Sequence, residues 1–107
     1  MARALIHMPS TAKRGDVFEI RALLAHPMES GYRPGTDGKP LPQDILRSFT
    51  CTYNGVQVFA AELHPAIAAN PYIAFFTVAQ DSGTLEFTWT GDKGFAQTER
   101  MPLTVTP

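Results

Sequence analysis

The segment from residue 45 to residue 60 constrains the fold more than any other part of the sequence. Polar and apolar residues alternate over residues 45–53 and again over 56–60, with Asn54-Gly55 between the two runs. Alternation of this kind is typical of a strand with one buried face. Asn and Gly both tolerate a positive φ, which the tight turn of a two-residue hairpin needs. The sequence therefore predicts a β-hairpin here.

The remaining apolar segments also have the lengths and turn signals of strands. Eight glycines and nine prolines fall mainly between them, where they mark turns and chain breaks. The best helical candidate, residues 65–69, allows only one turn. The predicted strands cover residues 3–8, 17–24, 45–53, 56–60, 72–78, 84–90 and 95–105. About seven strands in a chain of 107 residues predict a single all-β domain over residues 1–107, an antiparallel sandwich of two sheets.

Charge and hydropathy argue against two classes of partner. Nine basic and ten acidic residues give a formal net charge of -1, so the chain lacks the broad positive field that attracts nucleic acid. It contains no run of about 18 apolar residues, the length that spans a bilayer. The apolar run near the N-terminus is interrupted by His7 and stopped by Pro9, which makes it too short for a secretory signal. We expect no nucleic-acid partner, no membrane span and no export signal of its own.

Cys51 is the only thiol in the sequence. One cysteine closes no internal disulfide and supplies too few thiolates for a structural zinc site. The alternation places Cys51 in phase with Phe49 and Tyr53, so we expect it to point into the core as a small hydrophobic residue. The alternative is a redox or interface role, which needs an accessible thiol beside a base or a positive charge.

The three histidines give no metal-site pattern, because none lies within four residues of another. His26 and His64 each precede a proline, which favours extended geometry and fixes where the imidazole projects. Both are therefore candidates for a partner-binding surface, with a hydrogen-bonded loop histidine as the alternative. The sequence has no glycine-rich phosphate loop, no Gly-x-Ser-x-Gly and no His-Glu-x-x-His. We predict no catalytic residue, no metal and no cofactor.

The predicted strand over residues 72–78 is apolar on both faces. A sandwich strand normally leaves one face in contact with water. Ile73 and Phe75 lie on the second face, and Phe59 adds to the apolar surplus there. We expect Phe59, Ile73 and Phe75 to form an exposed partner-binding face. The alternative is that the aperiodic segment 27–42 folds over them; that segment is either a binding loop or a crossover between sheets.

Five strings, taken in order, resemble the SoxZ family of the sulfur-oxidising Sox system. They cover residues 12–15, 26–29, 49–55, 63–72 and 82–89. The resemblance implies an immunoglobulin-like sandwich that pairs with SoxY, the subunit carrying sulfur intermediates on the cysteine of a flexible C-terminal Gly-Gly-Cys-Gly-Gly arm. No such motif occurs in this sequence, so the covalent carrier role is not transferred to Cys51.

The resemblance further implies a non-catalytic subunit. It would form a heterodimer with a SoxY-like chain, help present the carrier arm to Sox enzymes that dock transiently, and work in the periplasm after export together with its partner. Alone, the chain would be free to form a homodimer through its unpaired apolar face. Two other hypotheses remain open: a redox or sulfur-accepting protein that uses Cys51, and a free-standing sandwich that binds a ligand through residues 27–42.

Overall fold

The computed structural model describes residues 2–107 and contains eight strands and one short helix. The elements are β1 (Ala4–His7), β2 (Thr11–Lys13), β3 (Val17–Leu24), β4 (Leu46–Tyr53), β5 (Val56–Glu62), β6 (Tyr72–Val78), β7 (Gly83–Gly91), the 3-10 helix η1 (Asp92–Gly94) and β8 (Ala96–Thr106). Within residues 2–107 no helix is long and apolar enough to cross a membrane.

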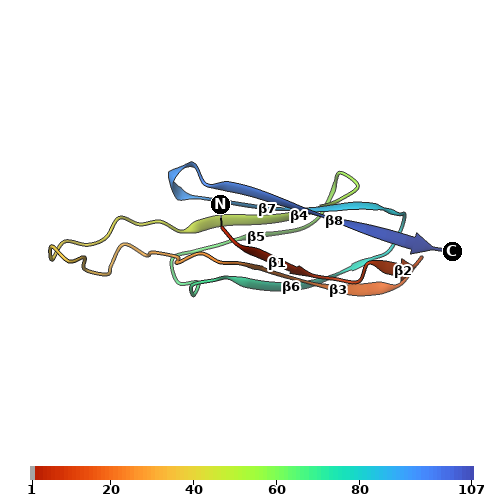
Figure 1. Ribbon diagram of the computed structural model, residues 1–107, viewed down its shortest axis with the longest axis horizontal. Coiled ribbons are helices and arrows are strands. Elements are labelled where there is room, and N and C mark those ends of the chain that lie inside the picture. Colours follow the sequence, from red (N-terminus) through yellow and green to blue (C-terminus); the bar gives the residue numbers. More distant parts are fainter. Residues whose placement is uncertain (1) are drawn as a thin grey trace.

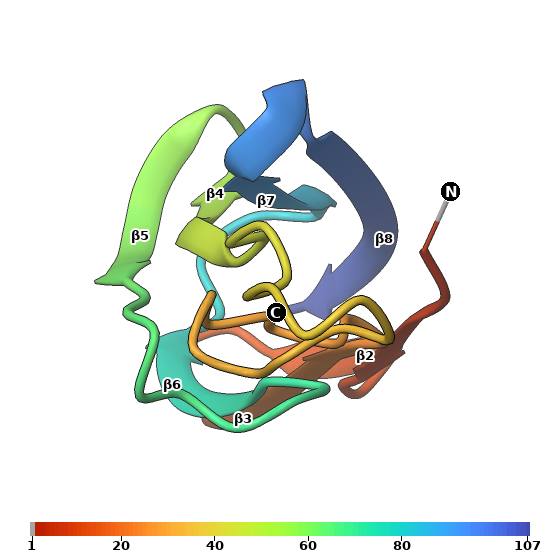
Figure 2. The same cartoon turned by 90° about the vertical axis from the view of Figure 1, so that its left-hand side faces the viewer.

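The strands form two sheets that pack face to face, which confirms the predicted all-β sandwich (Figure 1). One sheet has three strands in the order β1-β3-β6, and the other has five in the order β2-β8-β7-β4-β5. Figure 2, a view along the long axis, shows that β5 and β6 lie on the same side of the sandwich. These two strands are the edges of their sheets on that side.

The prediction of a purely antiparallel sandwich is incomplete, because β2 pairs with β8 in parallel register. Thr11 aligns with Thr104 and Lys13 with Thr106. A strand of three residues is too short to show the alternation by which strands are recognised in a sequence.

The predicted hairpin at Asn54-Gly55 is confirmed. Both residues have positive φ, 49° and 83°, as the mirror-image turn of a two-residue hairpin requires. The Asn54 side chain also accepts a hydrogen bond from the Thr84 N–H at 3.0 Å, which ties the turn to β7. β5 continues beyond its predicted end as far as Glu62.

The core lies between the sheets and is built around Phe49, which is fully buried. Its ring lies 5.1 to 6.3 Å from those of four other aromatic residues, which come from β5, β6 and β7. Offset and edge contacts at such distances add to the free energy gained by burial. One side chain on β4 therefore joins both sheets.

Residues 27–44, here called the arm, project from one end of the sandwich (Figure 1). The molecule measures 61 Å along its long axis but only 20 and 19 Å across. Paired backbone hydrogen bonds between Glu29 and Asp44, 2.8 and 2.7 Å long, hold the two halves of the arm together. The arm points away from β6, so the alternative in which residues 27–42 cover its aromatic side chains is wrong.

Replacing Phe49 with Ala should lower the free energy of unfolding by about 3–5 kcal/mol, because the substitution leaves a cavity between the sheets. Chemical denaturation measures this loss. Thr88→Ala, on the hydroxyl-bearing outer surface of the five-stranded sheet, is the matched control and should change stability by less than about 0.5 kcal/mol. Equal effects of the two substitutions would contradict the central place of Phe49 in the core.

Candidate functional site

Strand β6 is apolar on both faces, as predicted. The face that was expected to be exposed, however, points into the core. Phe75 is 6% exposed and stacks on Phe59 with ring centroids 4.3 Å apart. Ile73 and Phe59 are half-buried against the core. The expectation that Phe59, Ile73 and Phe75 form an exposed face is therefore wrong.

The reason is the pairing of β6 with β3. Ile20 aligns with Phe75, and Ala22 aligns with Ile73. Residues directly opposite each other in an antiparallel pair project to the same side of the sheet. Ile20 and Ala22 are core residues, so their partners on β6 face inward as well.

The surface that this register exposes is the outer face of the three-stranded sheet, here called the outer face. Five large apolar side chains on this face are exposed. The two aromatic ones, Tyr72 and Phe76, have exposed fractions of 57% and 64%. The outer-face residues of this kind are Leu5, Val17, Tyr72, Phe76 and Val78. Leu23 completes a row with Leu5 and Tyr72 across the three strands. A concentration of exposed apolar side chains on one sheet is typical of a protein interface.

A charged pair interrupts the apolar surface in its central strand. Arg21 donates a hydrogen bond to Glu19 at 2.7 Å. This bond, together with the charge of Glu19, raises the pKa of Arg21. Beside the pair is a hollow of about 330 Å³ lined by Leu5, Ile6, His7, Arg21, Leu23 and Tyr72. The outer face thus offers apolar side chains for burial and a polar centre that can orient a partner.

The outer surface of the five-stranded sheet is chemically different. Its outward residues include Ser48, Thr50, Thr52, Thr84, Thr88, Thr90 and Thr98. The hydroxyls of Ser48 and Thr90 share a hydrogen bond, and those of Thr88 and Thr98 are 3.1 Å apart. Hydroxyl-bearing strands suit a face that stays in water, so the apolar character belongs to one side of the molecule.

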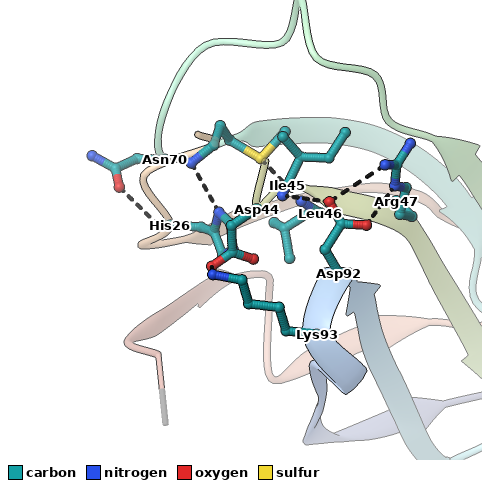
Figure 3. Close-up of polar contacts among 9 residues, drawn as sticks. His26, Asp44, Ile45, Leu46, Arg47, Asn70, Asp92 and Lys93 are labelled. Atoms are coloured by element: carbon teal, nitrogen blue, oxygen red, sulfur yellow. Dashed lines mark hydrogen bonds and ion pairs between the residues drawn. The ribbon is translucent and has the colours of Figure 1, made fainter. Parts of the chain in front are cut away.

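The base of the arm is held by a network of polar contacts (Figure 3). His26 is buried, and its Nδ1 accepts the Met28 N–H at 2.9 Å. The backbone N–H of His26 donates to Asn70 Oδ1 at 2.9 Å, and the imidazole Nε2 lies 4.0 Å from Asp44 Oδ1. These contacts favour the alternative of a hydrogen-bonded loop histidine for His26. His64 is exposed, in the loop between β5 and β6, so it alone of the two is accessible to a partner.

Asp92 fixes the other half of the base of the arm. Its carboxylate accepts the Ile45 N–H at 3.1 Å and the Arg47 Nε–H at 2.9 Å (Figure 3). These hydrogen bonds, with that from Arg47 the largest cause, lower the pKa of Asp92. The ion pair between Lys93 and Asp44, 3.9 Å apart, adds a second link.

Cys51 is fully buried, which confirms the prediction that it points into the core. Burial raises the pKa of its thiol to about 12, so the reactive thiolate is scarce near neutral pH. No group of three or more His, Cys, Asp or Glu side chains in the described part of the chain is placed to hold a metal ion.

Sequence reasoning did not single out Leu5, Val17, Tyr72 or Phe76, which the structure exposes on the outer face. A signal was present in the alternation of residues 17–24, which puts Glu19 and Arg21 outward. That signal does not extend to residues 72–78, because the exposed face of the second strand depends on its register with the first.

Comparison with known proteins gives one family match. Residues 6–102 match the model of the SoxZ family, described as sulphur oxidation protein SoxZ. No curated protein is detectably similar to the chain in sequence.

Two solved structures have a fold similar to that of this chain. The superoxide reductase (neelaredoxin) from Ignicoccus hospitalis superposes with a TM-score of 0.76 at 18% identity, covering 98% of this chain and 82% of that one. The sulfur carrier protein SoxY from Chlorobium limicola f thiosulfatophilum superposes with a TM-score of 0.68 at 11% identity, covering 97% and 79%. At these identities the likeness concerns the fold alone.

A thiol reagent should label Cys51 very slowly in the folded protein. At pH 8 a thiol with a pKa of about 12 is ionised to about one part in ten thousand, and the attacking species is the thiolate. Labelling should become fast and complete in denaturant, as followed by mass spectrometry. Rapid labelling without denaturant would contradict burial and favour the redox hypothesis.

Asp92→Asn should lower the melting temperature near neutral pH, because it removes the ion pair with Arg47. The pKa of Asp92 is lowered by folding, so its contribution is present above its ordinary pKa of 3.8 and is lost as pH falls through the folded value. Thermal melts of both proteins should differ by a constant amount above about pH 5 and converge in more acidic buffer. A difference that does not change with pH would contradict a role for the carboxylate charge.

Proposed function

Since the chain belongs to the SoxZ family, we propose that it is the non-catalytic subunit of a sulfur-compound carrier complex and pairs with a SoxY-like chain. The observation that carries the proposal is the family match over residues 6–102. The partner carries the sulfur intermediate on the cysteine of its own flexible C-terminal segment. This subunit supports that segment of the partner and helps present it to the enzymes of thiosulfate oxidation.

The state of Cys51 supports this division of labour. A covalent sulfur carrier needs a thiolate that reaches its reaction partners. Cys51 is buried between the sheets, with a raised pKa and no charged neighbour contributing to that shift. The sulfur chemistry of the complex is therefore assigned to the other chain.

The outer face supports the pairing. A stable heterodimer buries about 800 Å² on each partner and draws most of its affinity from a few aromatic and apolar anchors. Tyr72 and Phe76 are aromatic, exposed and held on a regular strand, so they lose little conformational freedom on binding. The Glu19–Arg21 pair within the same face gives the partner a charged feature to match.

The complex is proposed to work in the periplasm, which this subunit reaches folded and bound to a partner that carries the export signal. Other Sox enzymes dock on the complex transiently. Expressing the two chains with a signal only on the partner, and then assaying the periplasmic fraction for both, tests this route. Retention of this chain in the cytoplasm while its partner is exported would contradict it.

Co-expression with a SoxY-like chain tests the pairing itself. We expect a heterodimer that stays intact through affinity purification and size exclusion at micromolar concentration. A chain that remains free of this partner would contradict the proposed function. Binding of a small ligand to residues 27–42 without any second chain would instead favour the free-standing module.

Phe76→Arg should weaken the heterodimer about 30-fold or more, because loss of an aromatic anchor costs about 2 kcal/mol or more. Arginine is chosen because Glu19 lies directly across from Phe76, so the free subunit gains an opposite-charge neighbour and should fold normally. Thr88→Arg, on the hydroxyl-bearing sheet surface, is the control and should leave affinity unchanged in a titration. If both variants bind as the native protein does, the interface lies elsewhere.

A further inference from the structure

We propose that the free edge of β6 forms backbone hydrogen bonds with an edge strand of the SoxY-like partner, so that the three-stranded sheet continues into the second chain. This inference rests on the proposed pairing. It adds the element that makes the contact and the chemistry of the contact, which is main-chain pairing at a sheet edge.

The direction of the backbone groups of β6 follows from hydrogen bonds at the two ends of its pairing with β3. The Leu24 N–H donates to Pro71 O at 3.3 Å, and the Ala79 N–H donates to Asp16 O at 2.8 Å. In an antiparallel pair, hydrogen-bonded and non-hydrogen-bonded positions alternate. The register between these ends is unbroken, so the intervening hydrogen-bonded residues of β6 are Ile73, Phe75 and Thr77.

The other residues of β6 therefore direct their N–H and C=O groups away from β3. These residues are Tyr72, Ala74, Phe76 and Val78. No strand among residues 2–107 lies beyond β6 in its sheet. The same residues carry side chains of the outer face, so one added strand would meet both their free backbone groups and the margin of the apolar surface.

The edge of β6 lacks the devices that usually prevent strand addition. Its seven residues include no charge and no proline, and its pairing with β3 has no bulge. Natural sheets protect exposed edges with charged side chains, proline, bulges or short strands. An open edge of this length and composition invites pairing with another strand.

The other edges in the described part of the chain carry such protection. β5 has a register shift beside Cys51 and ends at Glu62. β1 has four residues and β2 has three. β8 carries Pro102 before the segment that pairs with β2. β6 is therefore the edge best suited to receive a strand.

The occupant that fits is the carrier subunit. The solved SoxY structure has a similar two-sheet fold, so a SoxY-like chain has edge strands of its own to offer. Main-chain hydrogen bonds provide affinity in strand addition, and alternate side chains provide specificity. Here Tyr72 and Phe76 supply those side chains on one face of the extended sheet.

Ala74→Pro tests the edge directly. Proline removes an N–H that points away from β3 and so leaves the β3–β6 ladder its own hydrogen bonds. We expect the affinity for the SoxY-like partner to fall at least ten-fold in a titration of purified chains, with the melting temperature close to that of the native protein. Val78→Pro, near the end of the strand, is a second variant of the same kind should Ala74→Pro fail to fold.

Ala60→Pro is the matched control on β5. The Leu63 N–H donates to Arg47 O at 2.9 Å, which makes Phe59 and Ala61 the hydrogen-bonded positions and turns the Ala60 N–H toward the free edge of β5. Both alanines are exposed. We expect Ala60→Pro to change the affinity by less than two-fold.

The outcomes separate this inference from the proposed function. If the native chain forms no complex with a SoxY-like partner, the proposed function fails. If the complex forms and Ala74→Pro and Val78→Pro bind as the native chain does, edge pairing is overturned while the partnership stands. If Ala74→Pro breaks only a dimer of this chain with itself, the occupant of the edge is a second copy, which also overturns the inference.

Discussion

The antiparallel pairing of β3 with β6 is the constraint on which the rest of the structure depends. It aligns Ile20 with Phe75, which directs Phe75 onto Phe49 and Phe59 in the core. Because side chains alternate along a strand, a slip of one residue would exchange the two faces of β6. Phe76 would then enter the core and Phe75 would be exposed. One register thus sets both the composition of the core and the apolar surface that the three-stranded sheet exposes.

The outer surfaces of the two sheets differ in chemistry. The five-stranded sheet presents hydroxyl groups to water, whereas the three-stranded sheet presents leucine, valine, tyrosine and phenylalanine side chains. The asymmetry suits the proposed role in a carrier complex, because such a subunit needs a partner surface more than a reactive centre. The buried, protonated Cys51 is consistent with sulfur chemistry that takes place on the other chain.

Much of the fold follows from local sequence, and the rest depends on contacts between distant residues. Asn54-Gly55 fixes a hairpin through its own backbone preferences, and the phase of Cys51 follows from its neighbours. The sequence of β6 does not show which of its faces is buried, because both faces are apolar. The register with β3 determines the buried face. The base of the arm is equally non-local: His26 pairs with Asn70, and Ile45 with Asp92. Neither contact follows from a local pattern, because the partners lie 44 and 47 residues apart in the sequence.

Hydroxyl-radical footprinting of the chain, alone and bound to a SoxY-like partner, tests most directly whether the outer face is the partner surface. Tyr72 and Phe76 are exposed on that face, and Tyr32 is exposed on the arm as an internal reference. If the outer face is the partner surface, oxidation of Tyr72 and Phe76 falls strongly in the complex, while Tyr32 reacts as in the free chain. Unchanged oxidation of Tyr72 and Phe76 in a stable complex would contradict it.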